Sequence, residues 1–322
     1  MTRKPQTTNP PLFSRLSVRL VDYALPLFVI LLALLTGYIE PRFFSASNIE
    51  NLSRQLVPLA IAAVGQAFAV IGGGLDLSIA AVMSVAGIAG ILVMNEYGIA
   101  AGVVTMILTG ALAGAANGAV IAYFRASPLI VTLGMLSIAQ AIALILSNGV
   151  PIYNVPESFV AAIGFNKVAG IPSSVLIGLG VLLAGWIVLR WTRFGRYIYA
   201  IGSSANAATK SGIDVRLNTM FIYMAVGVTT GIGAIVMTAW VGAAQPVAAP
   251  NLTLESIAAV VLGGVALAGG SGGIAHIILG TIIIGTLSNA LNMVGISAYY
   301  QTLAVGLVII AAVILDRVRF RK

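Results

Sequence analysis

The sequence of 322 residues has no cysteine, a single histidine and very few charged residues. Without cysteine, a disulfide framework, a thiolate zinc site, an iron–sulfur cluster and a cysteine nucleophile are all excluded. Charged residues make up 8% of the chain, far below the roughly 25% of a soluble domain, so a water-exposed globular surface is also excluded. Apolar residues make up 59%, and the mean hydropathy is +1.05. These values predict an all-α, polytopic membrane protein.

Apolar runs long enough to cross a bilayer follow one another along the chain. A crossing takes about 20 residues, so the length allows about ten transmembrane helices with their connections. We expect a membrane domain over residues 23–316, flanked by cytoplasmic tails at 1–22 and 317–322, with one long cytoplasmic loop at 192–218. The glycine-rich runs at 72–74 and 269–273 also allow broken helices that cross only half of the membrane.

The basic residues lie mainly in the tails and loops rather than in the apolar runs. Cytoplasmic loops of membrane proteins carry an excess of Lys and Arg, so this distribution places both termini in the cytoplasm. The basic groups are Arg3 to Arg19, Arg125, Arg190 to Arg216, and Arg317 to Lys322.

A weak internal repeat supports the expected number of spans. Three residues recur in the same order at a constant offset of 172 residues: Thr109, Asn117 and Gly134 return as Thr281, Asn289 and Gly306. About five spans separate the copies, so the copies would have opposite orientations. Inverted repeats are typical of transporters, with the path at the repeat interface. Three matches in a sequence rich in alanine and glycine also arise by chance, so both interpretations stay open.

Asp76 is the only acidic residue within an apolar stretch, directly after the glycine triplet 72–74. A charged carboxylate at the bilayer centre costs about 2.5–3.5 kcal/mol on insertion scales. One interpretation is a broken helix whose free backbone groups and Asp76 line or brace a pathway. The other is an amino-terminal cap, in which Asp76 or Ser78 accepts hydrogen bonds from the first amides of the next helix. The two are compatible.

Amide and hydroxyl side chains are scattered through the apolar runs without accompanying acids. Such groups suit neutral, polyhydroxylated ligands, although interhelical hydrogen bonding is their commoner use. The lone His276 cannot build a metal site, and we expect it to be a packed or capping residue. No Lys-Ser or Lys-Thr follows the glycine-rich runs, so a nucleotide-binding loop is rejected, and no constellation for an enzyme is present. The candidate pathway residues are Gln66, Asp76, Asn117, Thr132, Asn289 and Asn292.

The loop 192–218 contains the signals of a short helix. Ser203 or Ser204 can cap a run of good helix formers that ends at Gly212. A short capped helix with small side chains, in the middle of a cytoplasmic loop, favours a docking element that enters a groove of a partner. A plain loop lying at the membrane surface is the alternative.

Several motifs together resemble a known family. They are the loop 192–218, Gly72-Gly73-Gly74-Leu75-Asp76-Leu77-Ser78, Asn117-Gly118, Pro128-Leu129-Ile130-Val131-Thr132-Leu133-Gly134, Ala244-Gln245-Pro246, Ile257 to Gly264, Leu267 to Gly272, Asn289, and Tyr299-Tyr300-Gln301. Over roughly 57–316 the chain resembles the membrane permease subunit of bacterial ABC sugar importers of the ribose, xylose and galactose type. The chain departs from the family at Ala80, at His276 and over 250–255.

The resemblance implies a multi-pass protein of the bacterial inner membrane, with no enzymatic activity, that passes on a monosaccharide. The implied partners are a second permease subunit, a cytoplasmic ATPase with two nucleotide-binding domains, and a periplasmic sugar-binding protein; no nucleic acid is implied. No cofactor would bind this subunit, and ATP with Mg²⁺ would bind the ATPase. The loop helix would be the coupling helix, with Ser203, Ser204, Asn206, Ala207, Ala208, Ser211, Gly212 and Ile213.

Other functions stay open at this stage. The same importer class also carries nucleosides, a furanose signal molecule or branched-chain amino acids, and the sequence does not select the cargo. Nor does it say whether the second permease is identical. A secondary transporter would need its own site for a coupling ion, and apart from Asp76 the apolar runs hold no acid to provide one.

Overall fold

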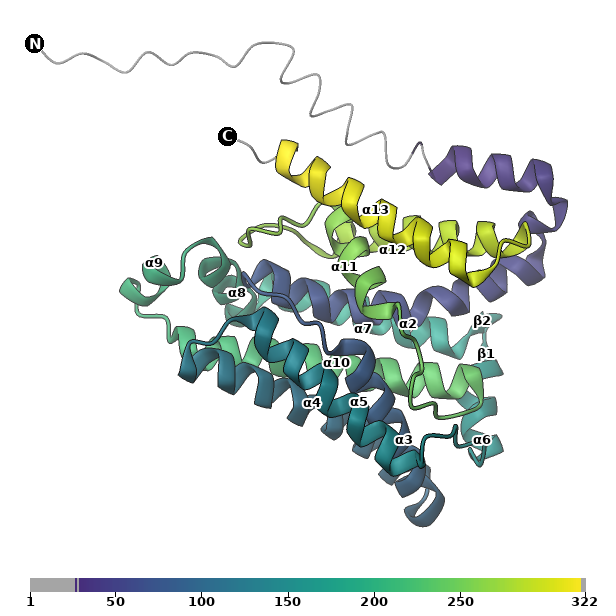
Figure 1. Ribbon diagram of the computed structural model, residues 1–322, viewed down its shortest axis with the longest axis horizontal. Coiled ribbons are helices and arrows are strands. Elements are labelled where there is room, and N and C mark those ends of the chain that lie inside the picture. The colour runs from purple at the N-terminus through teal and green to yellow at the C-terminus, as the bar shows by residue number, and fades with distance from the viewer. Residues whose placement is uncertain (1–26, 28, 320–322) are drawn as a thin grey trace, which may run out of the picture.

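The computed structural model describes residue 27 and residues 29–319, so the predicted tail 1–22 and the last residues 320–322 lie outside the described part. The fold is almost entirely helical (Figure 1). The elements are a helix over Val29–Ile39, η1 (Pro41–Phe44), α2 (Ala46–Ile71), α3 (Ile79–Tyr97), α4 (Ile99–Phe124), α5 (Pro128–Ser147), α6 (Glu157–Phe159), η2 (Val160–Phe165), β1 (Lys167–Val168), β2 (Ile171–Pro172), α7 (Ser173–Trp191), α8 (Arg193–Ser203), α9 (Ala205–Lys210), α10 (Val215–Val241), α11 (Leu252–Gly263), α12 (Ile274–Met293) and α13 (Ala298–Arg319).

The described residues contain seven helices that are long and apolar enough to cross a membrane: α2, α3, α4, α5, α7, α10 and α12. The prediction of an all-α polytopic membrane protein is confirmed, whereas the count of ten spans is not. The apolar run after Pro250 forms only the 12-residue α11, too short to cross the hydrocarbon as a helix. The polar segment 45–54 is part of α2, whose start is capped by Ser45: its hydroxyl accepts a hydrogen bond from the Asn48 amide at 3.3 Å.

The helix bounds follow the 172-residue offset of the sequence repeat. Adding 172 to the bounds of α2, 46–71, gives 218–243, against Val215–Val241 for α10. In the same way α3 corresponds to α11, α4 to α12, and α5 to α13. Figure 1 shows that α5 and α13 run in opposite directions between the two ends of the molecule. The chain is therefore built from two inverted four-helix units, α2–α5 and α10–α13.

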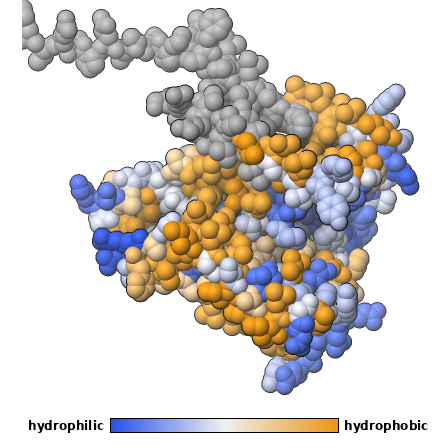
Figure 2. Space-filling view, in the orientation of Figure 1, coloured by the Kyte–Doolittle hydropathy of each residue, from blue (hydrophilic) through white to orange (hydrophobic). Residues whose placement is uncertain are grey.

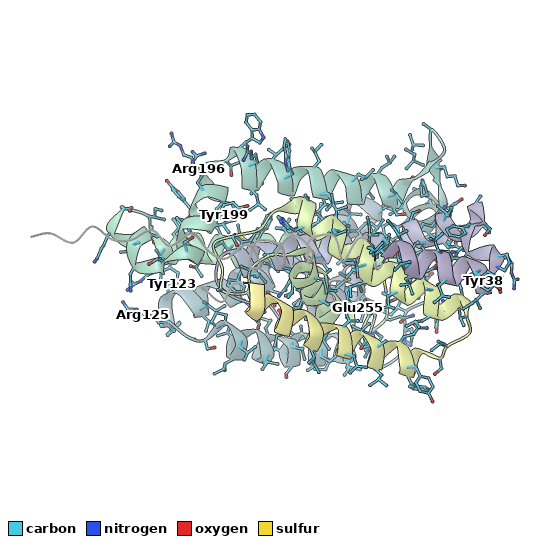
Figure 3. The ribbon with its side chains drawn as sticks, turned by 90° about the horizontal axis from the view of Figure 1, so that it is seen from above. Tyr38, Tyr123, Arg125, Arg196, Tyr199 and Glu255 are labelled. Atoms are coloured by element: carbon cyan, nitrogen blue, oxygen red, sulfur yellow. The ribbon has the colours of Figure 1, made fainter. Side chains whose placement is uncertain are left out.

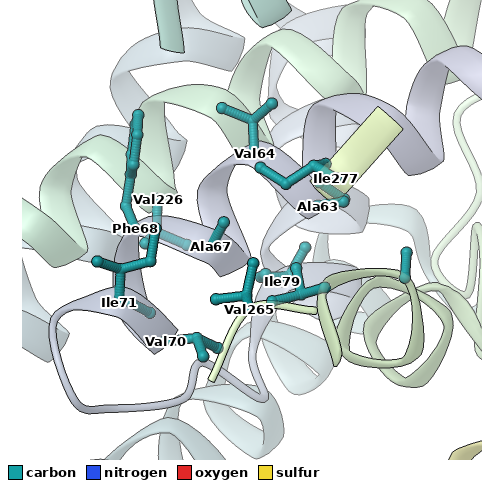
Figure 4. Close-up of a cluster of buried hydrophobic side chains, with 14 of the residues drawn as sticks. Ala63, Val64, Ala67, Phe68, Val70, Ile71, Ile79, Val226, Val265 and Ile277 are labelled. Atoms are coloured by element: carbon teal, nitrogen blue, oxygen red, sulfur yellow. The ribbon is translucent and has the colours of Figure 1, made fainter. Parts of the chain in front are cut away.

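Packing repeats with the same correspondence. In the first unit α3 contacts α4 and α5, and in the second α11 contacts α12 and α13. Across the units, α3 and α4 contact α10, while α11 and α12 contact α2. Thus α2 and α10 form a central pair that the other helices surround. Figure 4 shows the buried core around α2, with Ala63, Ala67 and Val70 beside Ile79, Val265 and Ile277.

Helices α4 and α10 approach each other backbone to backbone along a row of glycines. Gly110, Gly114 and Gly118 recur every fourth residue on the face of α4 that meets α10. A Cβ atom at Gly114 would overlap the carbonyl oxygen of Tyr223, and one at Gly110 would overlap that of Gly227. Small residues at this spacing let two membrane helices approach closely, so the two units are fastened along this line.

Polar side chains gather at the two ends of the bundle. In the face of Figure 2, hydrophobic side chains cover the middle, and hydrophilic ones collect toward α8 and α9 and toward the opposite end. Figure 3 places Arg125 and Arg196 at one end and Tyr38 at the other. The end with α8 and α9, which holds the predicted coupling helix, is called the coupling end from here on. The opposite end carries the ion pairs of Glu50 with Arg54 and with Lys167, each at 2.7 Å.

Candidate functional site

The first helix break separates α2 from α3. The helix α2 ends at Ile71, and Gly73 follows with φ +87°, a conformation that favours glycine. The amides of Gly73 and Gly74 still bond back to Val70 and Ala69, both at 2.9 Å. The chain then runs without helix to Ser78, and α3 begins at Ile79.

A second break follows the short helix α11. Residues 264–273 form an irregular loop before α12, and Gly264, Gly269, Gly270 and Gly272 all have positive φ. The amide of Gly270 donates a hydrogen bond of 2.8 Å to the carbonyl oxygen of Ile71, the last residue of α2. The loop therefore closes on the first break, although about 200 residues separate the two in sequence.

The loop 192–218 folds into two short helices and the start of α10. The hydroxyl of Thr192 caps α8 by accepting from the Gly195 amide at 3.0 Å, and that of Ser204 caps α9 by accepting from the Ala207 amide at 3.2 Å. Gly212 follows α9 with φ +81°. The prediction of a short helix capped at Ser204 and closed before Gly212 is confirmed, while Ser203 belongs to the end of α8.

Helix α8 contacts both breaks. A Cβ atom on Gly202 would overlap the carbonyl oxygen of Ile71 and approach the Gly270 amide. Tyr199 donates its hydroxyl to the carbonyl oxygen of Gly272 at 2.8 Å. Burial raises the pKa of the Tyr199 phenol, which keeps it protonated as a donor. A displacement of α8 would therefore act directly on the end of α2 and on the loop before α12.

A cavity of about 280 Å³ lies at this junction. Its walls come from the first break, from the start of α5, from α8 and α9, and from the first turns of α10. They include Gly72, Gly74, Pro128, Gly202 and Tyr223.

Asp76 is buried in a polar network at the start of α3. Its Oδ1 accepts from the Ser78 amide at 2.8 Å and from the Ser78 hydroxyl at 2.6 Å, and its Oδ2 accepts from Asn117 Nδ2 at 3.4 Å. Asn117 Nδ2 is also 3.1 Å from Ser78 Oγ. The expectation that Asp76 or Ser78 caps the first amides of α3 is wrong, because both side chains bond within the break and with α4.

The cap of α3 comes from the other repeat unit. Thr253, in the first turn of α11, accepts a hydrogen bond from the Ala80 amide at 3.0 Å. Under the 172-residue offset Ala80 corresponds to Leu252, so the amino-terminal ends of two equivalent helices meet here. Helix amino termini carry partial positive charge, and in transporters such ends often face the transported molecule.

The other candidate pathway residues lie apart from this network. Gln66 is completely buried in α2, and neither of its amide atoms finds a hydrogen-bond partner among the described residues. Thr132 bonds to Pro128 in its own helix at 2.9 Å. Asn289 is paired with Asn48 by two amide hydrogen bonds of 3.1 Å. Asn292 is exposed near the end of α12. The structure thus brings together Asp76 and Asn117 from this set.

The candidate coupling residues differ in exposure. Ala208 is 3% exposed and Ile213 is partly buried. His276, expected as a packed or capping residue, lies exposed in the first turn of α12, so the packed interpretation is wrong. Among the described residues no cluster of three or more His, Asp or Glu side chains could hold a metal ion. Six members of the predicted coupling set are exposed on the loop 192–218, called the coupling loop from here on: Ser203, Ser204, Asn206, Ala207, Ser211 and Gly212.

Sequence reasoning missed two features of the junction. It did not single out Gly202, whose only local signal is a lone glycine within a helical pattern. It also missed Thr253 as the cap of Ala80, because the two residues are 173 positions apart. Both features depend on contacts between segments that are distant in sequence.

Comparison with known proteins shows that the chain is similar to permease subunits of import systems. Residues 48–313 match the protein family described as "Branched-chain amino acid transport system / permease component". The chain is 36% identical over 292 residues to the ribose import permease protein RbsC of Haemophilus influenzae, covering 89% of this chain and 90% of that protein. It is 34% identical to the D-allose transport system permease protein AlsC of Escherichia coli, covering 87% of each. It is 33% identical to the L-arabinose transport system permease protein AraH of Escherichia coli, covering 86% of this chain and 84% of that protein.

Proposed function

Because this chain belongs to the family of ABC importer permeases of the ribose, allose and arabinose type, we propose that it is the membrane-spanning subunit of an ATP-driven importer of a monosaccharide. Permeases of this family are not enzymes themselves. In the proposal this subunit binds no cofactor, and ATP with Mg²⁺ is bound and hydrolysed by a cytoplasmic ATPase with two nucleotide-binding domains. A periplasmic sugar-binding protein delivers the cargo, and a second permease subunit, identical or related, completes the path.

The observation that carries the proposal is the position of α8 and α9. These helices project at the coupling end, and α8 contacts both helix breaks through Gly202 and Tyr199. An element that docks on an ATPase at one surface and on two interrupted helices at the other can convert a movement of the ATPase into a rearrangement of the path. The residues proposed to meet the ATPase are the exposed members of the predicted set, from Ser203 to Gly212.

The distribution of charge supports a cytoplasmic position for the coupling end. Basic residues gather there with Asp214, whereas the opposite end mixes acids and bases in ion pairs. The positive-inside rule then directs the coupling end and both termini to the cytoplasm of a bacterial inner membrane. The basic residues at this end are Arg125, Arg190, Arg193, Arg196, Lys210 and Arg216.

A sugar is favoured over the other cargoes. The family description names branched-chain amino acids, but the three relatives above carry sugar names and align over almost nine-tenths of the chain. Full-length similarity to several sugar permeases is more specific than the description of a broad family. We therefore rank a pentose or hexose first, with nucleosides, a furanose signal molecule and branched-chain amino acids behind it.

We place the path near the meeting point of α3 and α11. The two amino-terminal ends and the Asp76 network support this location. The predicted path residues Gln66, Asp76, Asn117, Thr132, Asn289 and Asn292 remain candidates. The environments of Asp76 and Asn289 favour supporting the adjoining helices over touching the sugar.

The test is reconstitution of the chain in proteoliposomes with its ATPase and binding protein, using ribose, allose and arabinose as probes. We expect uptake of at least one sugar that requires ATP and stops when the ATPase is left out. Uptake without the ATPase would instead show a secondary transporter. Uptake of leucine or a nucleoside with none of the sugars would overturn the proposed cargo while leaving the importer class intact.

A further inference from the structure

A deep apolar groove of about 570 Å³ opens between α7, α8 and α10. Its floor is formed by Val64 and Phe68 of the central helix α2. Its walls include Val188 of α7, Phe194 of α8 and Phe221 of α10. The groove lies on the surface of the bundle, where a membrane-spanning protein meets lipid, and almost all of its lining is hydrocarbon.

The groove runs along the membrane direction from the coupling end. On α10 its lining extends from Asn218 to Ile232, which at 1.5 Å per residue is about 21 Å. One half of the hydrocarbon core is about 15 Å thick. The groove therefore begins at the level of the coupling loop and covers roughly the depth of one leaflet.

Cationic and aromatic side chains surround the mouth of the groove. Arg193 and Arg196 stand directly before the lining residues Phe194 and Tyr197 on α8, and both arginines are exposed. Neither they nor Arg190 and Arg216, which lie two residues from the lining residues Val188 and Asn218, form an ion pair with any residue in the described part of the chain. Figure 3 shows Arg196 directed outward beside the end of α7.

The tryptophans of α7 mark the level of the membrane surface. Trp186 and Trp191 pack edge to face at 6.3 Å between ring centroids and are 45% and 69% exposed. Exposed tryptophan gathers at the headgroup level of membranes. The mouth of the groove, its arginines and this aromatic pair therefore lie together where lipid headgroups would be.

We propose that this groove binds an anionic phospholipid, with one acyl chain along α10 and the headgroup phosphate on Arg193 and Arg196. The assignment of this lipid to the cytoplasmic leaflet rests on the proposed function, which puts the coupling end in the cytoplasm. The binding of the lipid does not depend on the proposed function. The lipid would hold α8 against the bundle from outside, while Gly202 and Tyr199 hold it to the helix breaks from inside. Coupling would then depend on the lipid around the protein.

The hydrocarbon lining and the cationic mouth of the groove favour a lipid over a helix as its occupant. An acyl chain is narrower and matches the hydrocarbon lining, and a phosphate matches the unpaired guanidinium groups. A second copy of this chain, or another segment of it, is a competing occupant that the experiment below detects.

The test measures lipid binding by the purified chain alone, without ATPase, binding protein or sugar. Vesicles of phosphatidylcholine, and of phosphatidylcholine with an equal amount of phosphatidylglycerol, are used for reconstitution. Native mass spectrometry after extraction counts retained lipids. A phosphatidylglycerol with a photoreactive acyl chain then maps the contact. We expect one retained phosphatidylglycerol per chain and crosslinks on α7, α8 and α10.

Two kinds of variant, each with a control, test the parts of the site. Ala225→Trp, or Met224→Trp if the first fails to fold, fills the groove, and Leu183→Trp places the same ring on an exposed position of α7. Arg193→Gln with Arg196→Gln removes the charge, and Arg125→Gln is the control at the same end. We expect retention to fall about tenfold or more in the arginine variant, as for one lost charged contact. We expect it to fall in the groove variant as well, because the added ring occupies the space of the acyl chain.

Three results would overturn the proposal. They are equal retention in the groove variants and the controls, crosslinks spread evenly over the apolar surface, and a crosslink that joins the groove to a second copy or to another segment of the chain. Because the readout involves no transport, failure here leaves the proposed function standing. Failure of transport leaves the lipid site standing in the same way.

Discussion

Gly270 donates its backbone N–H to the carbonyl oxygen of Ile71 at 2.8 Å, so the last residue of α2 and the loop before α12 are directly joined. Gly202 of α8 packs on both partners of this hydrogen bond, with no room for a side chain. Three segments from distant parts of the sequence thus meet through their backbones. This contact makes the junction the natural place to test how a movement of the coupling loop reaches the membrane domain.

Gly202→Ala is expected to reduce ATP-driven uptake strongly. The added methyl group would overlap the carbonyl oxygen of Ile71, so α8 must shift away from the breaks; overpacking of this kind costs about 1–3 kcal/mol. Gly180→Ala in α7 is the matched control, because no atom lies within 4 Å of its added Cβ. Uptake and ATPase activity are measured together in proteoliposomes. Unchanged coupling in the Gly202 variant would show that α8 does not transmit the movement.

Ala207→Glu and Ala208→Glu are expected to fail for different reasons. Ala207 is exposed, so its charge would block docking on the ATPase while the fold persists. Ala208 is 3% exposed, so its charge would be buried and would unfold the loop instead. Co-purification with the ATPase and limited proteolysis of the loop separate the two outcomes. Normal uptake with normal ATPase association in the Ala207 variant would contradict a docking role for α9.

The Asp76 network predicts rescue between two residues. Asp76→Asn places two amide NH₂ groups together, but Asn117 can turn its unpartnered Oδ1 toward the new donor, so the loss should be small. Asp76→Leu leaves Ser78 and Asn117 without their acceptor. Each buried group without a partner should lower the free energy of unfolding by about 1–3 kcal/mol. Asn117→Asp brings two carboxylates together and should be severe.

The combination of Asp76→Asn with Asn117→Asp restores one carboxylate and one amide and should recover most of the stability. Thermal unfolding in detergent measures the stabilities, and sugar uptake is measured in parallel. A double variant no better than Asn117→Asp alone would show that the two side chains act independently.

Asn48 and Asn289 are expected to act on stability rather than on transport. Each amide donates to the other at 3.1 Å between α2 and α12. Asn289→Ala would leave Asn48 with fewer partners and should lower the free energy of unfolding by about 1 kcal/mol. A double-mutant cycle with Asn48→Ala should give a coupling energy of about 0.5–1.5 kcal/mol. Changed sugar preference at unchanged stability would instead place Asn289 in the path.

Gly114→Ala should destabilise the membrane domain as a whole. Its methyl group would overlap the backbone of α10 at Tyr223, and neither helix can move without disturbing the central pair. We expect a loss of about 1–3 kcal/mol. Gly134→Ala in α5 is the control, since its added Cβ meets no atom within 4 Å. Equal melting temperatures for the two variants would show that the close approach of α4 and α10 contributes nothing.

The sequence predicted those features that depend on local signals. The helical class followed from hydropathy, and α9 followed from the serine cap and Gly212, because capping joins residues three or four positions apart. The repeat was detectable at 172 residues because equivalent positions keep similar residue types. Interactions between distant segments were not predictable. Asn117 lies 41 positions from Asp76, and Thr253 lies 173 positions from Ala80. The sequence around each of these residues does not indicate which distant residue it contacts.

The glycine row of α4 has a mechanical consequence. At the equivalent positions of the second unit stand Ile282, Thr286 and Ala290, and α12 packs less extensively on α2 than α4 packs on α10. The units α2–α5 and α10–α13 share a topology, but they differ in how tightly their helices pack on the central pair. In the first unit, α4 packs on α10 backbone to backbone along its glycine row. In the second unit, α12 packs less extensively on α2. A displacement of α8, which contacts Ile71 and Gly270, should therefore move α11, α12 and α13 more than α3, α4 and α5.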